Sequence, residues 1–149
     1  MSRVTFLIGF FALAASGCSS SPGGPETVPV AGVITMGGQA VEGATVQFIG
    51  GQFSAFAKTD SSGKFSLEPG AVVGENKVLI SKLSMPAGAD PTMDEGQLMA
   101  MAGDPAMAAN KNAPKQLIPG QYSDPEKSTL TFVVPEDGSD SADFSLDAK

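Results

Sequence analysis

The chain lacks histidine and tryptophan altogether, and among its 149 residues it has only one cysteine, Cys18. Without histidine it lacks the side chain that most often serves as a general base at neutral pH and as a metal ligand. A single cysteine excludes a disulfide within the chain and leaves only one thiol that could act as a nucleophile. These absences argue against an enzyme, and we expect no catalytic residues, no bound metal and no cofactor.

Basic residues are also scarce, because 9 lysines and arginines stand against 16 aspartates and glutamates, which gives a formal net charge of −7. The only arginine is Arg3, so lysine supplies every other strong base in the chain. Proteins that bind nucleic acids or anionic membrane surfaces do so with clustered lysine and arginine. The composition therefore excludes a role in binding nucleic acid.

The N-terminus carries a short apolar run that leads to the cysteine. Arg3 precedes an apolar run at residues 4–15, and Gly17 lies directly before Cys18. The run is shorter than the roughly 20 apolar residues that a membrane-spanning helix needs. A positive charge, an apolar run and small residues in this order are typical of a secretory signal. The pattern resembles the lipobox of bacterial lipoproteins, although Ala15 stands where that family usually has leucine.

This resemblance implies that residues 1–17 are a lipoprotein signal peptide, cleaved between Gly17 and Cys18, and that a lipid is attached to Cys18. The membrane would then be a partner of the protein through this anchor. Ser19 follows the cysteine, and because it is not aspartate, the resemblance implies the outer membrane of the bacterial cell envelope. The alternative is an ordinary secretory signal with an incidental cysteine.

Beyond the cysteine, the composition changes twice. Residues 19–27 are small, polar and rich in proline and glycine, so they have too little apolar surface to fold. We therefore predict a flexible tether at residues 18–27. The remaining residues 28–149 are enough for one domain with its own core.

Short apolar or alternating segments separated by turn residues recur along this domain, and helical periodicity is almost absent. They predict strands at residues 28–35, 44–49, 53–58, 65–68, 75–83, 129–134 and 143–147. Paired glycines at residues 37–38 and 50–51 supply turns, and Pro69 with Gly70 is expected to end the fourth strand. The pattern predicts an all-β protein, a single antiparallel β-sandwich of about seven strands.

Several of these segments resemble a known family. Residues 30–35 (VAGVIT), 37–48 (GGQAVEGATVQF) and 59–65 (TDSSGKF) are similar to the carboxypeptidase regulatory-like domain. Residues 117–125 (LIPGQYSDP) look like the closing part of the same group, which recurs in small bacterial envelope lipoproteins. The resemblance implies a transthyretin-like (prealbumin-like) sandwich. Asn76 stands where the family usually has an aromatic residue, so we expect a core or corner contact to be missing there.

The segment at residues 59–64 has the composition of a tight turn. Asp60 can cap its own backbone and Gly63 can adopt a left-handed conformation, and the family resemblance implies that both belong to a recurrent structural turn. The alternative is a calcium loop built on Asp60, Ser62 and Gly63. A hairpin turn is favoured, because the segment has one carboxylate where calcium loops usually have several.

A second acidic cluster lies near the C-terminus, where a divalent cation is the alternative to a solvated hairpin loop. Its members are Glu136, Asp137, Asp140, Asp143 and Asp147. Interspersed glycine and serine favour the loop, and we predict no metal there.

Residues 84–116 interrupt the strand pattern and are rich in methionine. They contain Met85, Met93, Met99, Met101 and Met107. Thioethers can hold Cu(I), but no histidine or free cysteine is present to complete such a site. We predict instead an insertion, a loop or short helix near residues 94–102, in which methionine is an adaptable apolar filler and forms a surface for a partner.

These observations together predict a non-enzymatic envelope lipoprotein. Its sandwich would be a structural, adhesive or protein-interaction module tethered by the lipidated Cys18, and we expect a protein partner in the envelope. The alternative is a ligand-binding lipoprotein that recognises carbohydrate or a divalent cation. The absence of tryptophan and the single tyrosine argue against carbohydrate, because aromatic faces usually stack on sugar rings.

Overall fold

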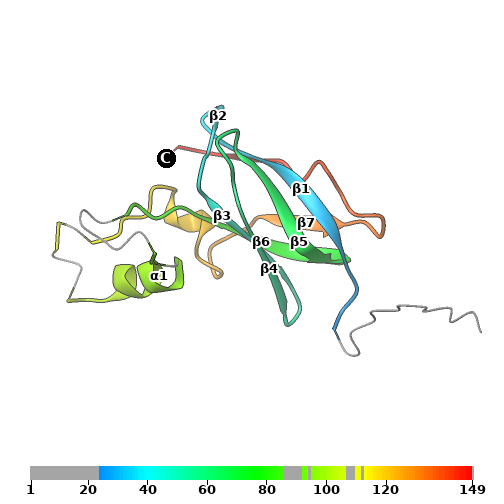
Figure 1. Cartoon of the computed structure of the whole chain (residues 1–149), viewed down its shortest axis with the longest axis horizontal. Helices are drawn as coiled ribbons and strands as arrows, with labels where there is room; N and C mark the ends of the chain where they lie inside the picture. Colours follow the sequence, from blue (N-terminus) through cyan, green and yellow to red (C-terminus); the bar gives the residue numbers. More distant parts are fainter. Residues whose placement is uncertain (1–23, 86–91, 94, 107–109, 112, 149) are drawn as a thin grey trace, which may run out of the picture.

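Two four-stranded sheets pack face to face in the computed structural model, which describes residues 24–85, 92–93, 95–106, 110–111 and 113–148 (Figure 1). The elements in chain order are β1 (Thr27–Met36), β2 (Gln39–Ala40), β3 (Thr45–Gly50), β4 (Phe53–Lys58), β5 (Lys64–Val72), β6 (Gly74–Ser81), α1 (Glu95–Gly103), η1 (Gly120–Tyr122), β7 (Thr131–Val134) and β8 (Phe144–Leu146). The predicted all-β sandwich is therefore confirmed. β1 begins at Thr27, the last residue of the predicted tether.

The first sheet is built around β1. Its strand order is β2-β1-β5, and β8 also pairs with β1. Among the described strands, β8 is the exception to the antiparallel arrangement, because it runs parallel to β1 with Ile34 opposite Phe144. The paired glycines predicted to form a turn join β1 to the short β2, where Thr35 lies opposite Ala40.

The second sheet has the order β4-β3-β6-β7, and neighbouring strands in it are antiparallel. β3 is an inner strand, with Phe48 opposite Ala55 of β4 on one side and opposite Val78 of β6 on the other. β4 and β7 are the edge strands. Since side chains alternate across a strand, one face of this sheet faces the core and the other faces outward.

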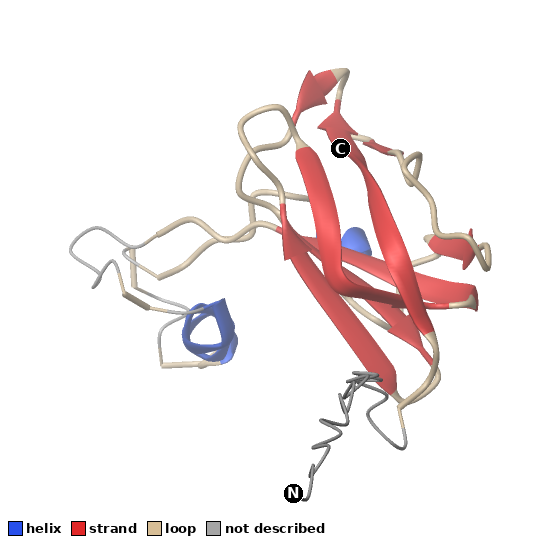
Figure 2. Cartoon of the chain, turned by 45° about the vertical axis from the view of Figure 1, so that its right-hand side comes forward, coloured by secondary structure: helices blue, strands red, loops and turns tan. Residues whose placement is uncertain are grey.

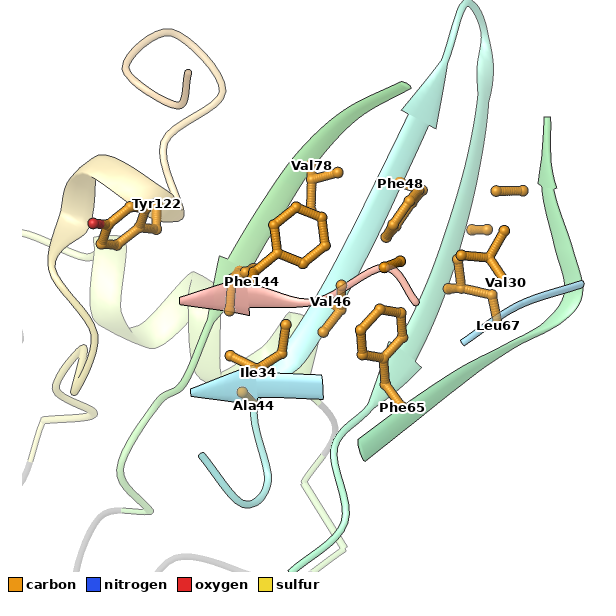
Figure 3. Packing of buried hydrophobic residues seen from close by; sticks show 14 of the residues in the cluster. Val30, Ile34, Ala44, Val46, Phe48, Phe65, Leu67, Val78, Tyr122 and Phe144 are labelled. Atoms are coloured by element: carbon orange, nitrogen blue, oxygen red, sulfur yellow. The ribbon is translucent and has the colours of Figure 1, made fainter. Parts of the chain in front are cut away.

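The core lies between the sheets and is centred on Phe48, which is fully buried. The Phe48 ring lies 6.1 Å from the ring of Phe65 and 6.2 Å from that of Phe144, measured between centroids. Figure 3 shows these three rings within one cluster together with aliphatic side chains from both sheets. Tilted and edge-on aromatic pairs at such distances contribute about 0.5–1.5 kcal/mol each beyond the area they bury.

The expected end of the fourth strand at Pro69 and Gly70 is wrong, because β5 continues to Val72. The pairing with β1 shifts register at this point, so that Pro29 alone faces residues 68–70. This bulge accommodates a proline and a glycine within the strand. Gly70 has φ +125°, and a Cβ at this position would lie 2.2 Å from the carbonyl oxygen of Val28.

The predicted insertion leaves the sandwich after β6 and returns before η1. Its two arms pair with each other, through a bridge between Leu83 and Gln116 and a hydrogen bond from the Leu117 N–H to the Lys82 carbonyl at 2.8 Å. The short helix predicted near residues 94–102 is α1, which Figure 2 shows beside the two sheets. No helix within the described part of the chain combines the length and apolarity needed to span a bilayer.

Candidate functional site

The predicted lipidation site lies outside the described residues. This holds for Gly17, Cys18 and the whole of residues 1–17. The structure contains the far end of the predicted tether, where Thr27 enters β1.

Asp60 and Gly63 meet in one tight turn between β4 and β5. The Asp60 carboxylate accepts hydrogen bonds from the backbone N–H groups of Ser62 at 2.7 Å and Lys64 at 3.0 Å, both through Oδ1. Gly63 has φ +74°, and its carbonyl accepts a 2.8 Å hydrogen bond from the N–H of Ile34. A Cβ on Gly63 would lie 2.5 Å from the Ile34 carbonyl oxygen. The Asp60 carboxylate thus binds backbone amides and organises the turn.

The other acidic residues are dispersed. Within the described part of the chain, no three side chains among His, Cys, Asp and Glu gather closely enough to hold a metal ion. In the C-terminal cluster, Asp143 accepts a 2.9 Å hydrogen bond from the N–H of Val33, and so links this segment to β1. Among the methionines considered for copper, Met107 and the side chain of Met99 are not among the parts that the structure describes. Met85 is exposed.

Asn76, which stands where the resemblance implies an aromatic residue, makes corner contacts of its own. Its side chain is 1% exposed, and its Nδ2 donates to the carbonyls of Val72 at 2.6 Å and Gly74 at 3.0 Å. These bonds hold the connection between β5 and β6. Asn76 Oδ1 is buried and has no hydrogen-bond partner among the described residues.

A groove lies on the outer face of the second sheet, beside α1. It has a volume of about 510 Å³, and its floor comes from β4, β3 and β6. Gly96 of α1 and Ser123, which follows η1, line its walls. The volume falls in the range of about 300–1,000 Å³ that is usual for small-ligand sites.

The floor of the groove is divided into two rows by the strand register. In one row, Thr45 lies between Lys58 on β4 and Ser81 on β6. The next row on the same face places Gln47 between Phe56 and Leu79. Same-face rows are separated by about 7 Å along the strands. One row is therefore polar with a cation at its end, and the other presents large apolar side chains at both ends.

The exposure of these apolar side chains distinguishes the groove from an ordinary solvated sheet face. Phe56 is 57% exposed at the rim, whereas Leu79 is 8% exposed although it lies outside the main core cluster. Along the strand predicted at residues 75–83, Leu79 shares its side with Lys77 and Ser81. The groove could have been predicted from two apolar residues on otherwise polar strand faces. One is Leu79, and the other is Phe56, which lies between Ser54 and Lys58 on the outward side of β4.

A surface ion pair lies near the start of the segment that leads to β7. Lys127 Nζ lies 2.7 Å from Asp124 Oδ2, and the hydrogen bond it donates lowers the pKa of Asp124 and raises that of Lys127. The Glu126 N–H also donates to Asp124 Oδ1 at 2.9 Å and lowers the same pKa. This pair orders a surface turn and is exposed.

Comparison with protein-family models, with curated proteins and with solved structures found no match to this chain.

Proposed function

We propose that this chain is a lipid-anchored protein of the bacterial cell envelope, whose β-sandwich is a non-enzymatic structural, adhesive or protein-interaction module. The observation that carries the proposal is the placement of the only cysteine, Cys18, shortly after an apolar run and directly after Gly17. Acylation of this residue gives the lone thiol a chemical role. Acylation also fits the absence of a second cysteine in the given sequence, since Cys18 has no partner there for a disulfide.

The spacing between the anchor and the domain supports this proposal. β1 begins at Thr27, so the segment after Cys18 is short and rich in small residues, proline and glycine. Extended chain covers at most about 3.3–3.6 Å per residue, so this tether reaches roughly 30 Å. The sandwich would therefore work close to the membrane surface, within reach of other envelope components.

The edges of the second sheet are the contact surfaces that we assign to this module. β4 presents Phe56, and β7 presents Val133, which is 67% exposed. Edge strands carry backbone groups that can pair with an added strand, and exposed apolar side chains next to them supply affinity. Carbohydrate binding is less well supported, because Tyr122 is buried and its hydroxyl accepts a hydrogen bond from the Asp147 N–H at 3.1 Å.

The anchor is tested by fractionation of cells that express the full chain. Wild-type protein and the control Ser21→Ala, which changes only the tether, should sediment with membranes. Cys18→Ser should lose the acyl group and move to the fraction released from membranes. Continued membrane association of Cys18→Ser would contradict the proposed anchor.

The interaction module is tested separately by photocrosslinking in intact cells. A photoreactive residue at Val133 should capture a discrete protein partner, whereas the same residue at Lys64, on the first sheet, should not. Equal labelling at both positions, or none at Val133, would contradict the assignment of this edge.

A further inference from the structure

The described lining of the groove on the second sheet is positively charged, whereas the chain as a whole is acidic. Lys58 is the one charged residue among the residues that the structure shows lining it, and no carboxylate is among them. The chain as a whole carries a formal net charge of −7. In the described part of the chain, the ion pair found joins Asp124 to Lys127 and does not involve Lys58. Lys58 is itself exposed, so its ammonium group can reach an anion from solvent.

The apolar part of the groove lies next to this cation. Phe56 and Leu79 belong to the row adjacent to the row of Lys58, about 7 Å further along the strands. A ligand that satisfies both rows must carry an anionic group at one end and an apolar body directly beside it. Burying the apolar body there removes the exposed Phe56 ring from water, which is favourable by about 25 cal/mol per Å² of area covered.

We propose that this groove binds a medium-chain fatty acid, with its carboxylate at Lys58 and its hydrocarbon chain over Phe56 and Leu79. The volume of about 510 Å³ accommodates a small amphipathic molecule of this kind. Lysine donates charge-assisted hydrogen bonds to a carboxylate, while its aliphatic stem extends the apolar surface. This site goes beyond the proposed function, since it needs neither the anchor nor a protein partner.

A second copy of the chain is a less suitable occupant of the groove than a fatty acid. Gly96 of α1 and Ser123 also line the groove, which is of the size of a small-ligand site. A second copy of the chain would bring a further net charge of −7 toward the molecule, which opposes association.

The test is a calorimetric titration of decanoate into the full chain in a nonionic detergent, with the titration into detergent alone subtracted. Decylammonium has the same chain with the opposite charge, and decanol has no charge. We expect saturable binding of decanoate that is roughly tenfold tighter than that of decanol, since one charge-assisted hydrogen bond has about this value. Decylammonium should bind more weakly than decanol.

Variants locate the site. Lys58→Met keeps the aliphatic stem and removes the charge, so it should weaken decanoate binding roughly tenfold and leave decanol binding unchanged. Phe56→Ser should weaken the binding of both. Lys64→Met, which removes an exposed lysine from the first sheet, is the matched control and should change neither.

The absence of saturable decanoate binding would overturn the proposal. Equal binding of decanoate and decylammonium would also overturn it, as would decanoate binding that both Lys58→Met and Phe56→Ser leave unchanged. These outcomes are independent of the membrane fractionation of Cys18→Ser, so failure of this site and failure of the anchor are distinguished.

Discussion

The hydroxyl of Thr59, the residue after β4, is buried and makes two hydrogen bonds to backbone groups. Thr59 is 5% exposed, and its Oγ1 accepts the Ala44 N–H at 2.8 Å and donates to the Val41 carbonyl at 2.5 Å. These bonds join the end of β4 to the segment that leads into β3. The side chain thus satisfies two backbone groups from a segment distant from it in sequence.

Thr59→Val keeps the shape of the side chain and removes the hydroxyl. It leaves the Ala44 N–H and the Val41 carbonyl buried without this partner, at a cost of about 1–3 kcal/mol each. We expect the free energy of unfolding to fall by about 3 kcal/mol. Thr59→Ser keeps the hydroxyl and loses one buried methyl group, which costs about 1 kcal/mol.

Urea unfolding of the full chain, followed by far-ultraviolet circular dichroism, measures both changes. With a denaturant dependence of about 1–3 kcal/mol per molar urea, Thr59→Val should lower the midpoint by about 1–3 M. Thr59→Ser should lower it by a third of that amount. A valine variant as stable as the serine variant would refute the assignment of the hydroxyl bonds as the main contribution of this residue.

Other perturbations follow from the same structure. Gly63→Ala should destabilise the fold by at least about 2 kcal/mol, because it places a side chain at positive φ against a backbone carbonyl. Gly24→Ala, where no atom lies within 4 Å of the new Cβ, should be neutral in the same urea titration. The lowered pKa of Asp124 predicts a stabilising contribution that is present above its unfolded value of 3.8 and is lost as pH falls through the folded value. Asp124→Asn should therefore reduce the loss of stability on acidification in pH-dependent denaturation curves, and an unchanged acid limb would contradict the pair. Replacing residues 86–113 with a short glycine linker should leave a single cooperative transition, since the arms on either side pair with each other. Loss of cooperativity would place the insertion in the core.

The sequence predicted the sandwich because its strands alternate and its turns have distinctive residues. The paired glycines after β1 and the Asp60 to Gly63 segment appear as turns in the structure. Pro69 and Gly70 were misread because these residues usually end a strand. Only the tertiary pairing with β1 shows that a bulge carries the chain past them.

Two features of the site depend on contacts that no local pattern contains. The amide of Asn76 donates to carbonyls of the adjoining connection, and these partners follow from the tertiary position of β6. The groove depends on the register of three strands and on the position of Gly96 of α1, which also lines it. Each of its residues was visible in the sequence, whereas their assembly into a polar row and an apolar row was not.

We propose that Cys18 is the first residue of the mature protein and carries the lipid. Mass spectrometry of the N-terminal peptide, from protein extracted from membranes, tests it most directly. We expect a peptide that begins at Cys18 with a mass increased by a diacylglyceryl group or a further acylated form of it. A peptide that begins at any other residue, or one in which Cys18 is unmodified, would contradict the lipid anchor.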